Sequence, residues 1–311
     1  MKMKKGIALS GGGARSFCQI GVLKVLEKEG IHFDVITGTS MGAIIGTIYS
    51  FTQSAEQLED IIFKIFSKSE LKKIENFFSR KRERNYFNRF VDGIKDFSIL
   101  LFDSFKSGIF DSEIIKEKIY MYIGKEIYFE EQKNILGIIA TDYFSGKTVI
   151  FNKGKIIPSL IASCAIPGLI TPVKINDKYY VDGGVTSNLP VIANHILGGE
   201  IIIGIENNSP LEKEKPFNAF EVFLQIEKIK NNYSNIFEGS MADFLLKIEL
   251  PYTEWFNFSK LKQCIKIGED YTFKNLELIE KIIINQKKKD LRNEIIENLK
   301  DFFSIRESTR I

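Results

Sequence analysis

A serine placed between two glycines is the first feature of this sequence that could do chemistry. The run Gly38-Thr39-Ser40-Met41-Gly42 follows the apolar pair Val35-Ile36 and has the spacing of a nucleophile elbow. In such an elbow a strand turns sharply into a helix and lifts a serine hydroxyl out of the backbone, and glycine leaves room on both sides. We therefore predict that Ser40 is a nucleophile, with Gly38 and Gly42 shaping the turn.

A serine nucleophile needs a base, and the sequence has only two histidines, His32 and His195. The run Asp182-Gly183-Gly184 ends an apolar stretch, and a buried carboxylate with a raised pKa could take the proton of Ser40 directly. The order Ser40, Asp182, His195 also permits a histidine-dependent triad. However, His195 falls in the second turn of a helix begun by Pro190, and His32 precedes its strand. We predict a dyad of Ser40 and Asp182, with Asp182 as a mere turn cap as the alternative.

A glycine-rich loop could stabilise the oxyanion of an acyl-transfer reaction. The run Gly11-Gly12-Gly13-Ala14-Arg15 places consecutive backbone N–H groups beside the start of a predicted helix, where negative charge is favoured. A dinucleotide-binding loop is the alternative, since Asp34 lies about 20 residues on. Ser16 stands where the third glycine of that fingerprint would fall, and Asp34 begins its strand instead of ending it. We therefore predict that residues 11–15 form an oxyanion hole.

The composition is that of an ordinary globular protein, with 311 residues, 44% hydrophobic and 27% charged. No flexible linker is evident, so we expect one domain carrying insertions. The cysteines Cys18, Cys164 and Cys264 are far apart and odd in number, which argues against disulfides and against a zinc site. We expect free thiols and a reducing, cytoplasmic location.

Contact with lipid would have to occur at the surface of the protein. The basic N-terminus is followed by too short an apolar run for a signal peptide, and no run reaches the 18 apolar residues of a membrane span. Between Lys64 and Lys95 there are ten Lys and Arg against four Asp and Glu, interleaved with aromatic residues. This stretch could meet an anionic membrane, or it could be a solvated helix face over a buried aromatic stripe. Nucleic acid is disfavoured because no binding motif accompanies the charge.

Strands and helices are expected to alternate around these motifs. Such alternation predicts a parallel sheet with right-handed crossovers and a site at the carboxyl ends of its strands. Beyond residue 219 we expect a mostly helical region with a charged tail. The expected strands are 4–10, 32–37, 135–141, 148–151, 179–181 and 201–205, and the expected helices are 15–30, 41–51, an insertion over 54–123, one around Ile161 and one from Pro190.

The three chemical motifs, in this order along the chain, resemble the patatin-like phospholipase family. Further stretches are similar to its bacterial members, namely Ile20-Gly21-Val22-Leu23-Lys24-Val25-Leu26, Ala140-Thr141-Asp142 and Ser163-Cys164-Ala165-Ile166-Pro167-Gly168. The likeness runs from about Lys5 to Pro190 and more loosely to about Asp270. The sequence departs from the family at Ser16, where glycine is usual, and at Gln19, where bacterial members often carry histidine.

The resemblance implies a three-layer α/β/α fold with a mainly parallel central sheet and a helical insertion. The expected single domain spans residues 1–311, with a catalytic core at about 5–210, the insertion at about 54–123 and a mostly helical C-terminal region at about 215–311. It also implies hydrolysis of acyl esters of phospholipids or lysophospholipids by a dyad of Ser40 and Asp182, without histidine, metal or cofactor. The competing hypothesis is a lipid-binding or partner-binding protein whose hydrolase activity is weak or lost.

Overall fold

The computed structural model describes residues 3–66, 126–208, 210–211, 219–251, 258–285, 295–296, 299 and 302–308. The basic aromatic stretch therefore lies outside the described residues from residue 67 onward, as does the helical insertion between residues 67 and 123. Among the helices of the described ranges, none is long and apolar enough to cross a lipid bilayer.

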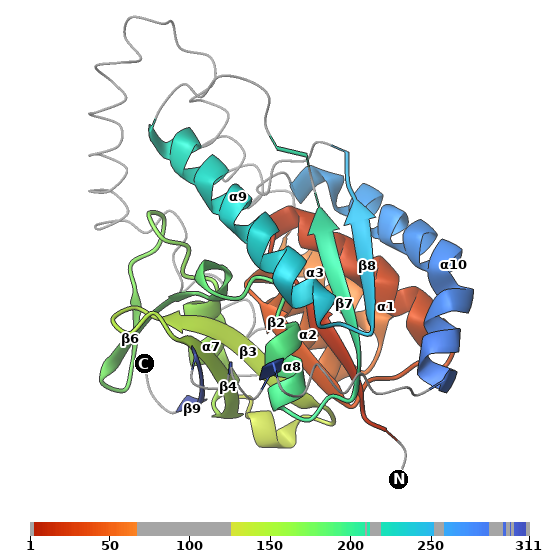
Figure 1. Ribbon diagram of the computed structural model, residues 1–311, viewed down its shortest axis with the longest axis horizontal. Coiled ribbons are helices and arrows are strands. Elements are labelled where there is room, and N and C mark those ends of the chain that lie inside the picture. Colours follow the sequence, from red (N-terminus) through yellow and green to blue (C-terminus); the bar gives the residue numbers. More distant parts are fainter. Residues whose placement is uncertain are drawn as a thin grey trace, which may run out of the picture.

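One mixed β-sheet lies at the centre of the described structure (Figure 1). Its strands are β1 (Lys5–Leu9), β2 (Val35–Thr39), β3 (Ile135–Asp142), β4 (Thr148–Gly154), β5 (Val173–Ile175), β6 (Lys178–Asp182), β7 (Ile201–Asn208), β8 (Phe244–Glu249) and β9 (Phe303–Ser308). They run in the order β5-β6-β3-β2-β1-β7-β8, and β4 pairs with both β3 and β9. Strands β3, β2, β1, β7 and β8 are parallel, whereas β4, β5 and β6 are held by antiparallel pairs.

Helices cover both faces of this sheet and make three layers. They are α1 (Cys18–Lys28), α2 (Met41–Thr52), α3 (Ala55–Ile65), α7 (Ile156–Ser163), α8 (Val191–Ile196), α9 (Ala219–Ser240) and α10 (Leu261–Asn285). Ile7 and Leu9 of β1 belong to a core shared with α1, α2, α3, α7 and α10. Ala8 points to the opposite face and packs with α8 and with Met241, just beyond α9. Figure 1 shows α8 and α9 on the side of the sheet away from α1 and α3. The predicted three-layer α/β/α architecture is confirmed.

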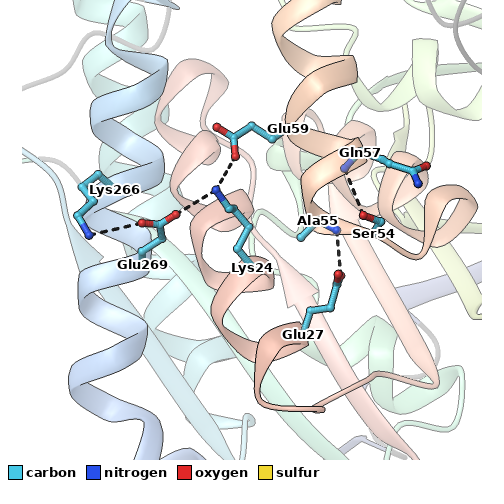
Figure 2. A network of polar contacts seen from close by, with 8 residues as sticks. All are labelled: Lys24, Glu27, Ser54, Ala55, Gln57, Glu59, Lys266 and Glu269. Carbon is cyan, nitrogen blue, oxygen red and sulfur yellow. Dashed lines mark hydrogen bonds and ion pairs between the residues drawn. The ribbon is translucent and has the colours of Figure 1, made fainter.

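Polar contacts connect α1, α3 and α10, which lie on the same face of the sheet (Figure 2). The Nζ of Lys24 on α1 lies 2.7 Å from the Oε2 of Glu59 on α3 and 3.2 Å from the Oε1 of Glu269 on α10. The Oε2 of Glu27 accepts a hydrogen bond of 2.9 Å from the N–H of Ala55, at the start of α3, where the helix dipole favours negative charge. Partly exposed ion pairs add little stability, so their main effect is to orient α1, α3 and α10.

Most expected elements are present, but two of them begin later than expected. The helix expected from Arg15 begins with a 3-10 turn, η1 (Gly13–Phe17), before α1, and the strand expected from His32 begins only at Val35. The expected helix end at Gly30 is confirmed, since this residue has φ 69° and the N–H of Ile31 donates to the carbonyl of Leu26 at 2.8 Å.

Helices α9 and α10 make up most of the described C-terminal region, but the sequence did not indicate its two strands, β8, which pairs with β7, and β9, which pairs with β4. Strand β8 alternates between buried and exposed residues over only a few positions, with Leu246 and Ile248 turned inward. Among the described strands, β9 pairs only with β4. Such short, half-covered strands leave a weak period in the sequence. The three-residue strand β5, which pairs with β6, was not expected either.

Candidate active site

Ser40 occupies a strained turn between β2 and α2. Its backbone has φ 53° and ψ −122°, a combination that costs a non-glycine residue about 1 to 3 kcal/mol and that tends to occur at functional sites. The N–H of Ser40 donates to the Oγ of Ser163 at 2.9 Å. The Ser40 residue is only partly buried. The predicted strand–turn–helix elbow is therefore present, with the hydroxyl-bearing residue accessible at the carboxyl end of β2.

The two glycines of the elbow allow backbones to approach closely. A Cβ atom at Gly42 would lie 2.3 Å from the carbonyl oxygen of Leu9, in the neighbouring strand β1. A Cβ atom at Gly38 would lie 2.4 Å from the carbonyl oxygen of Gly42 itself. Both distances are far below van der Waals contact. The turn at Ser40 thus depends on the absence of side chains at Gly38 and Gly42, as the sequence predicts.

Asp182 ends β6 opposite Ala140 of β3 and is only 6% exposed. Its Oδ1 accepts a hydrogen bond of 2.7 Å from the N–H of Gly184, and the side chain of Ser40 lies near enough to its carboxyl group to lower the pKa of Asp182. A Cβ atom at Gly183 would lie 2.4 Å from the carbonyl oxygen of Ile139, so this residue packs directly on β3. The structure therefore brings Asp182 and Ser40 together from strands 142 positions apart in the chain.

Burial raises the pKa of Asp182 from its ordinary 3.8 to about 6. The hydrogen bond from Gly184, the nearby Ser40 side chain and the charge of Lys230 oppose this shift by lowering the pKa, whereas the charge of Glu227 adds to it. A carboxylate with a pKa near 6 is ionised at neutral pH and is a stronger base than an exposed aspartate. Asp182 therefore has the electrostatic character that a general base for Ser40 requires.

The glycine-rich loop follows β1 directly beside Ser40. A Cβ atom at Gly11 would lie 3.4 Å from the Cβ of Ser40, and Gly12 and Gly13 have φ values of 150° and 58°. The N–H of Gly11 donates to the carbonyl of Asn188 at 3.0 Å, and the N–H of Arg15 donates to the carbonyl of Gly12 at 3.3 Å.

The other three N–H groups of this loop are not hydrogen-bonded in this way. Within the described part of the chain, the N–H groups of Gly12, Gly13 and Ala14 have no acceptor. Gly12 and Gly13 are also partly exposed, whereas Ala14 is buried. Of the five residues in the predicted oxyanion hole, these three are the ones whose N–H groups have no acceptor within the described part of the chain. The oxyanion hole itself stays a prediction.

Buried polar side chains hold this loop from below. The Nδ2 of Asn207, at the end of β7, lies 3.0 Å from the carbonyl of Gly11, 2.8 Å from the Oγ of Ser10 and 3.1 Å from the Oγ of Ser16. The Nε2 of Gln19 donates to the carbonyl of Ser10 at 2.7 Å. Ser16 and Gln19, the two positions that depart from the family pattern, are thus buried hydrogen-bonding partners of the loop's base.

Sequence reasoning missed Asn207, because an isolated asparagine at a strand end has no distinctive spacing. It also missed Cys164 as a site residue, whose buried thiol lies close enough to Ser40 and Asp182 for both to affect its pKa. Burial, with a smaller contribution from the charge of Asp182, raises the pKa of the Cys164 thiol. This cysteine is therefore neutral, and its uncharged thiol lies beside Ser40 and Asp182. All three cysteines, including Cys18 and Cys264, are free and buried, as expected.

Neither histidine lies at this site. Both ring nitrogens of His195 face backbone carbonyls, with Nδ1 at 3.2 Å from Gly199 and Nε2 at 3.1 Å from Met241. His32 is exposed at the amino end of β2. Asp34 also lies at that end, where its Oδ2 accepts from the N–H of Lys5, so it is not placed for the ribose of a dinucleotide. Among the described residues, no cluster of three or more His, Cys, Asp or Glu could hold a metal ion.

The sequence profile described as "Patatin-like phospholipase" matches residues 7–194. This range covers more than half of the chain and contains the glycine-rich loop, Ser40 and Asp182. The chain belongs to the patatin-like phospholipase family.

Similar proteins agree with this assignment. An uncharacterized NTE family protein of Mycobacterium tuberculosis is 28% identical over 244 residues, which cover 77% of this chain and 59% of that protein. A lysophospholipase, NTE1, of Phaeosphaeria nodorum is 25% identical over 211 residues, covering 68% of this chain but only 12% of the relative. The crystal structure of VipD from Legionella pneumophila has a TM-score of 0.51 at 16% identity, over 89% of this chain and 67% of that one. The chain thus spans little more than half the length of the mycobacterial relative, and the likeness to VipD concerns the fold.

The raised pKa of Asp182 implies a pH-dependent cost of folding. Between the ordinary value of 3.8 and the folded value of about 6, the folded chain binds more protons than the unfolded chain, so stability falls as pH rises through this window. Asp182→Asn removes that titration. We expect its free energy of unfolding, relative to wild type, to be higher at pH 8 than at pH 4.5 by about 2 kcal/mol, measured by urea unfolding.

Asp177→Asn, in an exposed turn, is the matched control and should show no such pH-dependent gain. A relative stability of Asp182→Asn that is the same at both pH values would contradict the raised pKa of Asp182.

Proposed function

We propose that this protein hydrolyses fatty acyl esters of phospholipids or lysophospholipids with Ser40 as nucleophile and Asp182 as general base. The observation that carries the proposal is the position of Ser40, on a strained elbow, beside a buried carboxylate whose pKa is raised to about 6. Family membership supports the lipid substrate, and the relative named lysophospholipase supports the ester class.

In the first half of the reaction, Asp182 accepts the Ser40 proton as the Oγ attacks the ester carbonyl carbon. The carbonyl oxygen becomes an oxyanion and is stabilised by the free N–H groups of Gly12, Gly13 and Ala14 beside η1. When this intermediate collapses, the bond from carbon to the leaving oxygen breaks and Asp182 returns its proton to that oxygen. The acyl group is then bonded to Ser40.

In the second half, water replaces the alcohol. Asp182 takes a proton from the water as its oxygen attacks the acyl carbon, and the same N–H groups hold the second oxyanion. Collapse releases the fatty acid and returns the proton to Ser40. One carboxylate thus serves as base and acid in turn, and the partial exposure of Ser40 provides the route by which water and ester reach it.

Removing either member of the dyad should abolish turnover. We expect Ser40→Ala and Asp182→Asn each to lower kcat on a short-chain p-nitrophenyl ester by at least about 10³-fold, because they remove the nucleophile or its base. His195→Ala should keep near-normal kcat, since both ring nitrogens of His195 face backbone carbonyls. Initial rates of ester hydrolysis and circular dichroism of each variant make the test.

Retained turnover in Ser40→Ala or Asp182→Asn would overturn the dyad, and loss of turnover in a folded His195→Ala would favour a histidine-dependent hydrolase. A wild-type protein that binds lipid vesicles but cleaves no lipid of a defined panel would favour the binding function instead. The products from that panel would also identify the headgroup and the position of cleavage.

A lipid substrate lies in a membrane or micelle, and α9 offers a surface to meet it. Six apolar side chains with 38% to 73% exposure recur at helical spacing along its outer face, namely Val222, Ile226, Ile229, Tyr233, Ile236 and Phe237. The opposite face of the same helix carries the buried side chains of Asn235 and Glu238. Helices with solvent on one side normally expose the polar face. We therefore propose that the outer face of α9 contacts the lipid surface.

Polar replacements on this face should weaken lipid binding without changing the chemistry. We expect the double variant Ile226→Ser/Tyr233→Ser to bind phosphatidylcholine–phosphatidylglycerol vesicles on the order of 10-fold more weakly. The reason is that two apolar side chains are no longer available to transfer from water into the lipid on binding. Its kcat on the soluble ester should match that of wild type. Phe273→Ser on α10, at a position 72% exposed, is the matched control. Equal vesicle affinity of the double variant and wild type, measured by co-sedimentation, would contradict this surface.

A further inference from the structure

The segment Ser187–Pro190 lies between the candidate catalytic motifs and touches all of them. The carbonyl of Ser187 accepts a hydrogen bond of 2.8 Å from the hydroxyl of Thr39, the residue before Ser40. The carbonyl of Asn188 accepts one of 3.0 Å from the N–H of Gly11. The N–H of Ser187 in turn donates to the carbonyl of Gly183 at 2.8 Å, next to Asp182. This connecting segment therefore joins the elbow, the glycine-rich loop and the turn that holds the base.

Two side chains of α9 hold the connecting segment from its other side. Glu238 accepts hydrogen bonds from the hydroxyl of Ser187, through Oε1, and from the N–H of Ile192 at 3.1 Å, through Oε2. Asn235 accepts a hydrogen bond of 3.2 Å from the Nδ2 of Asn188. Residues three apart in a helix lie on one face, so Asn235 and Glu238 meet neighbouring residues of the segment from a single side of α9.

Burying the carboxylate of Glu238 at this position costs desolvation free energy. Glu238 is 3% exposed and stands beside an apolar cluster that includes Leu189 and Ile192. Burial raises its pKa from 4.5 to about 7, although the hydrogen bonds from Ser187 and Ile192 lower it. An apolar residue would pack at this position without the desolvation cost. What Glu238 adds is directional hydrogen bonding to the connecting segment.

We propose that Glu238, together with Asn235, is a positioning residue for the acyl-transfer site, which acts through the connecting segment to hold Ser40 and the glycine-rich loop in register with Asp182. The proposal rests on the function proposed above and adds to it a residue that touches no substrate. It follows that α9 sets the geometry of the site with its inner face while its outer face is exposed. A displacement of about 1 Å in such a site is enough to slow a reaction by up to about 100-fold.

The test compares kcat and KM on the soluble p-nitrophenyl ester. We expect Glu238→Ala to lower kcat by about 10-fold to 100-fold with KM within about twofold of wild type, because the ester still binds but meets a displaced dyad. Glu238→Gln keeps one carbonyl oxygen as an acceptor and should recover part of the lost kcat. Ser187→Ala removes only the hydroxyl that bonds to Glu238, so it should lower kcat in the same way even where Glu238→Ala folds poorly.

Thr272→Ala is the control for general destabilisation. Thr272 is fully buried on α10 and donates only to the carbonyl of Gly268 in its own helix, at 2.7 Å. It should lower the thermal midpoint without changing kcat at temperatures where the variant is folded. Unchanged kcat in folded Glu238→Ala and Ser187→Ala, with an active wild type, would overturn the positioning role alone. A wild type inert on every ester tested would overturn the proposed function itself, and the positioning role with it.

Discussion

The site depends on a steric constraint where the backbones of β1, β2 and the start of α2 meet. Ser40 has a positive φ, and its turn places Gly42 so close to β1 that a Cβ atom would lie 2.3 Å from the carbonyl of Leu9. Because β1 and β2 are parallel neighbours, the glycine-rich loop that leaves β1 emerges beside the turn that leaves β2. The strain at Ser40 is sustained by this packing. The Ser40 residue and the glycine-rich loop are therefore held side by side by the fold itself, which is the preorganisation that the proposed acyl transfer would use.

Two buried carboxylates place stability and function in opposition. Asp182 and Glu238 both have pKa values raised by burial, to about 6 and about 7, so each disfavours the folded chain when it is ionised. The hydrophobic layers around β1, β2 and β7 offset this cost. A protein optimised for stability alone would replace both residues, whereas in the proposed function Asp182 serves as the base and Glu238 positions the site. The polar inner face of α9, which carries Asn235 and Glu238, is likewise explained by the proposed function and not by stability.

The parts of the site formed by continuous motifs could be predicted from the sequence. The residues that distant segments bring to the site could not. The elbow, the glycine-rich loop and the run after Asp182 are continuous motifs in which turn geometry demands glycine, so the strands and helices around Ser40 were placed to within a few residues. Asn207 and Glu238 belong to the site only because β7 and α9 fold back on it. Single polar residues carry no period, and no spacing distinguishes them from exposed ones. The short strands β8 and β9 were missed for a related reason, since sheet pairing between distant segments decides their conformation.

The central claim is that Asp182 activates Ser40, and the pH dependence of Ser40 phosphonylation tests it most directly. A fluorophosphonate reacts with an activated serine without any need for lipid recognition, and mass spectrometry locates the adduct. The account predicts that the labelling rate of wild type rises with pH through a midpoint near 6, as Asp182 ionises. In Asp182→Asn the labelling should be slow and should lack that midpoint. Equally fast labelling of Ser40 in Asp182→Asn, with the same pH profile, would contradict the account.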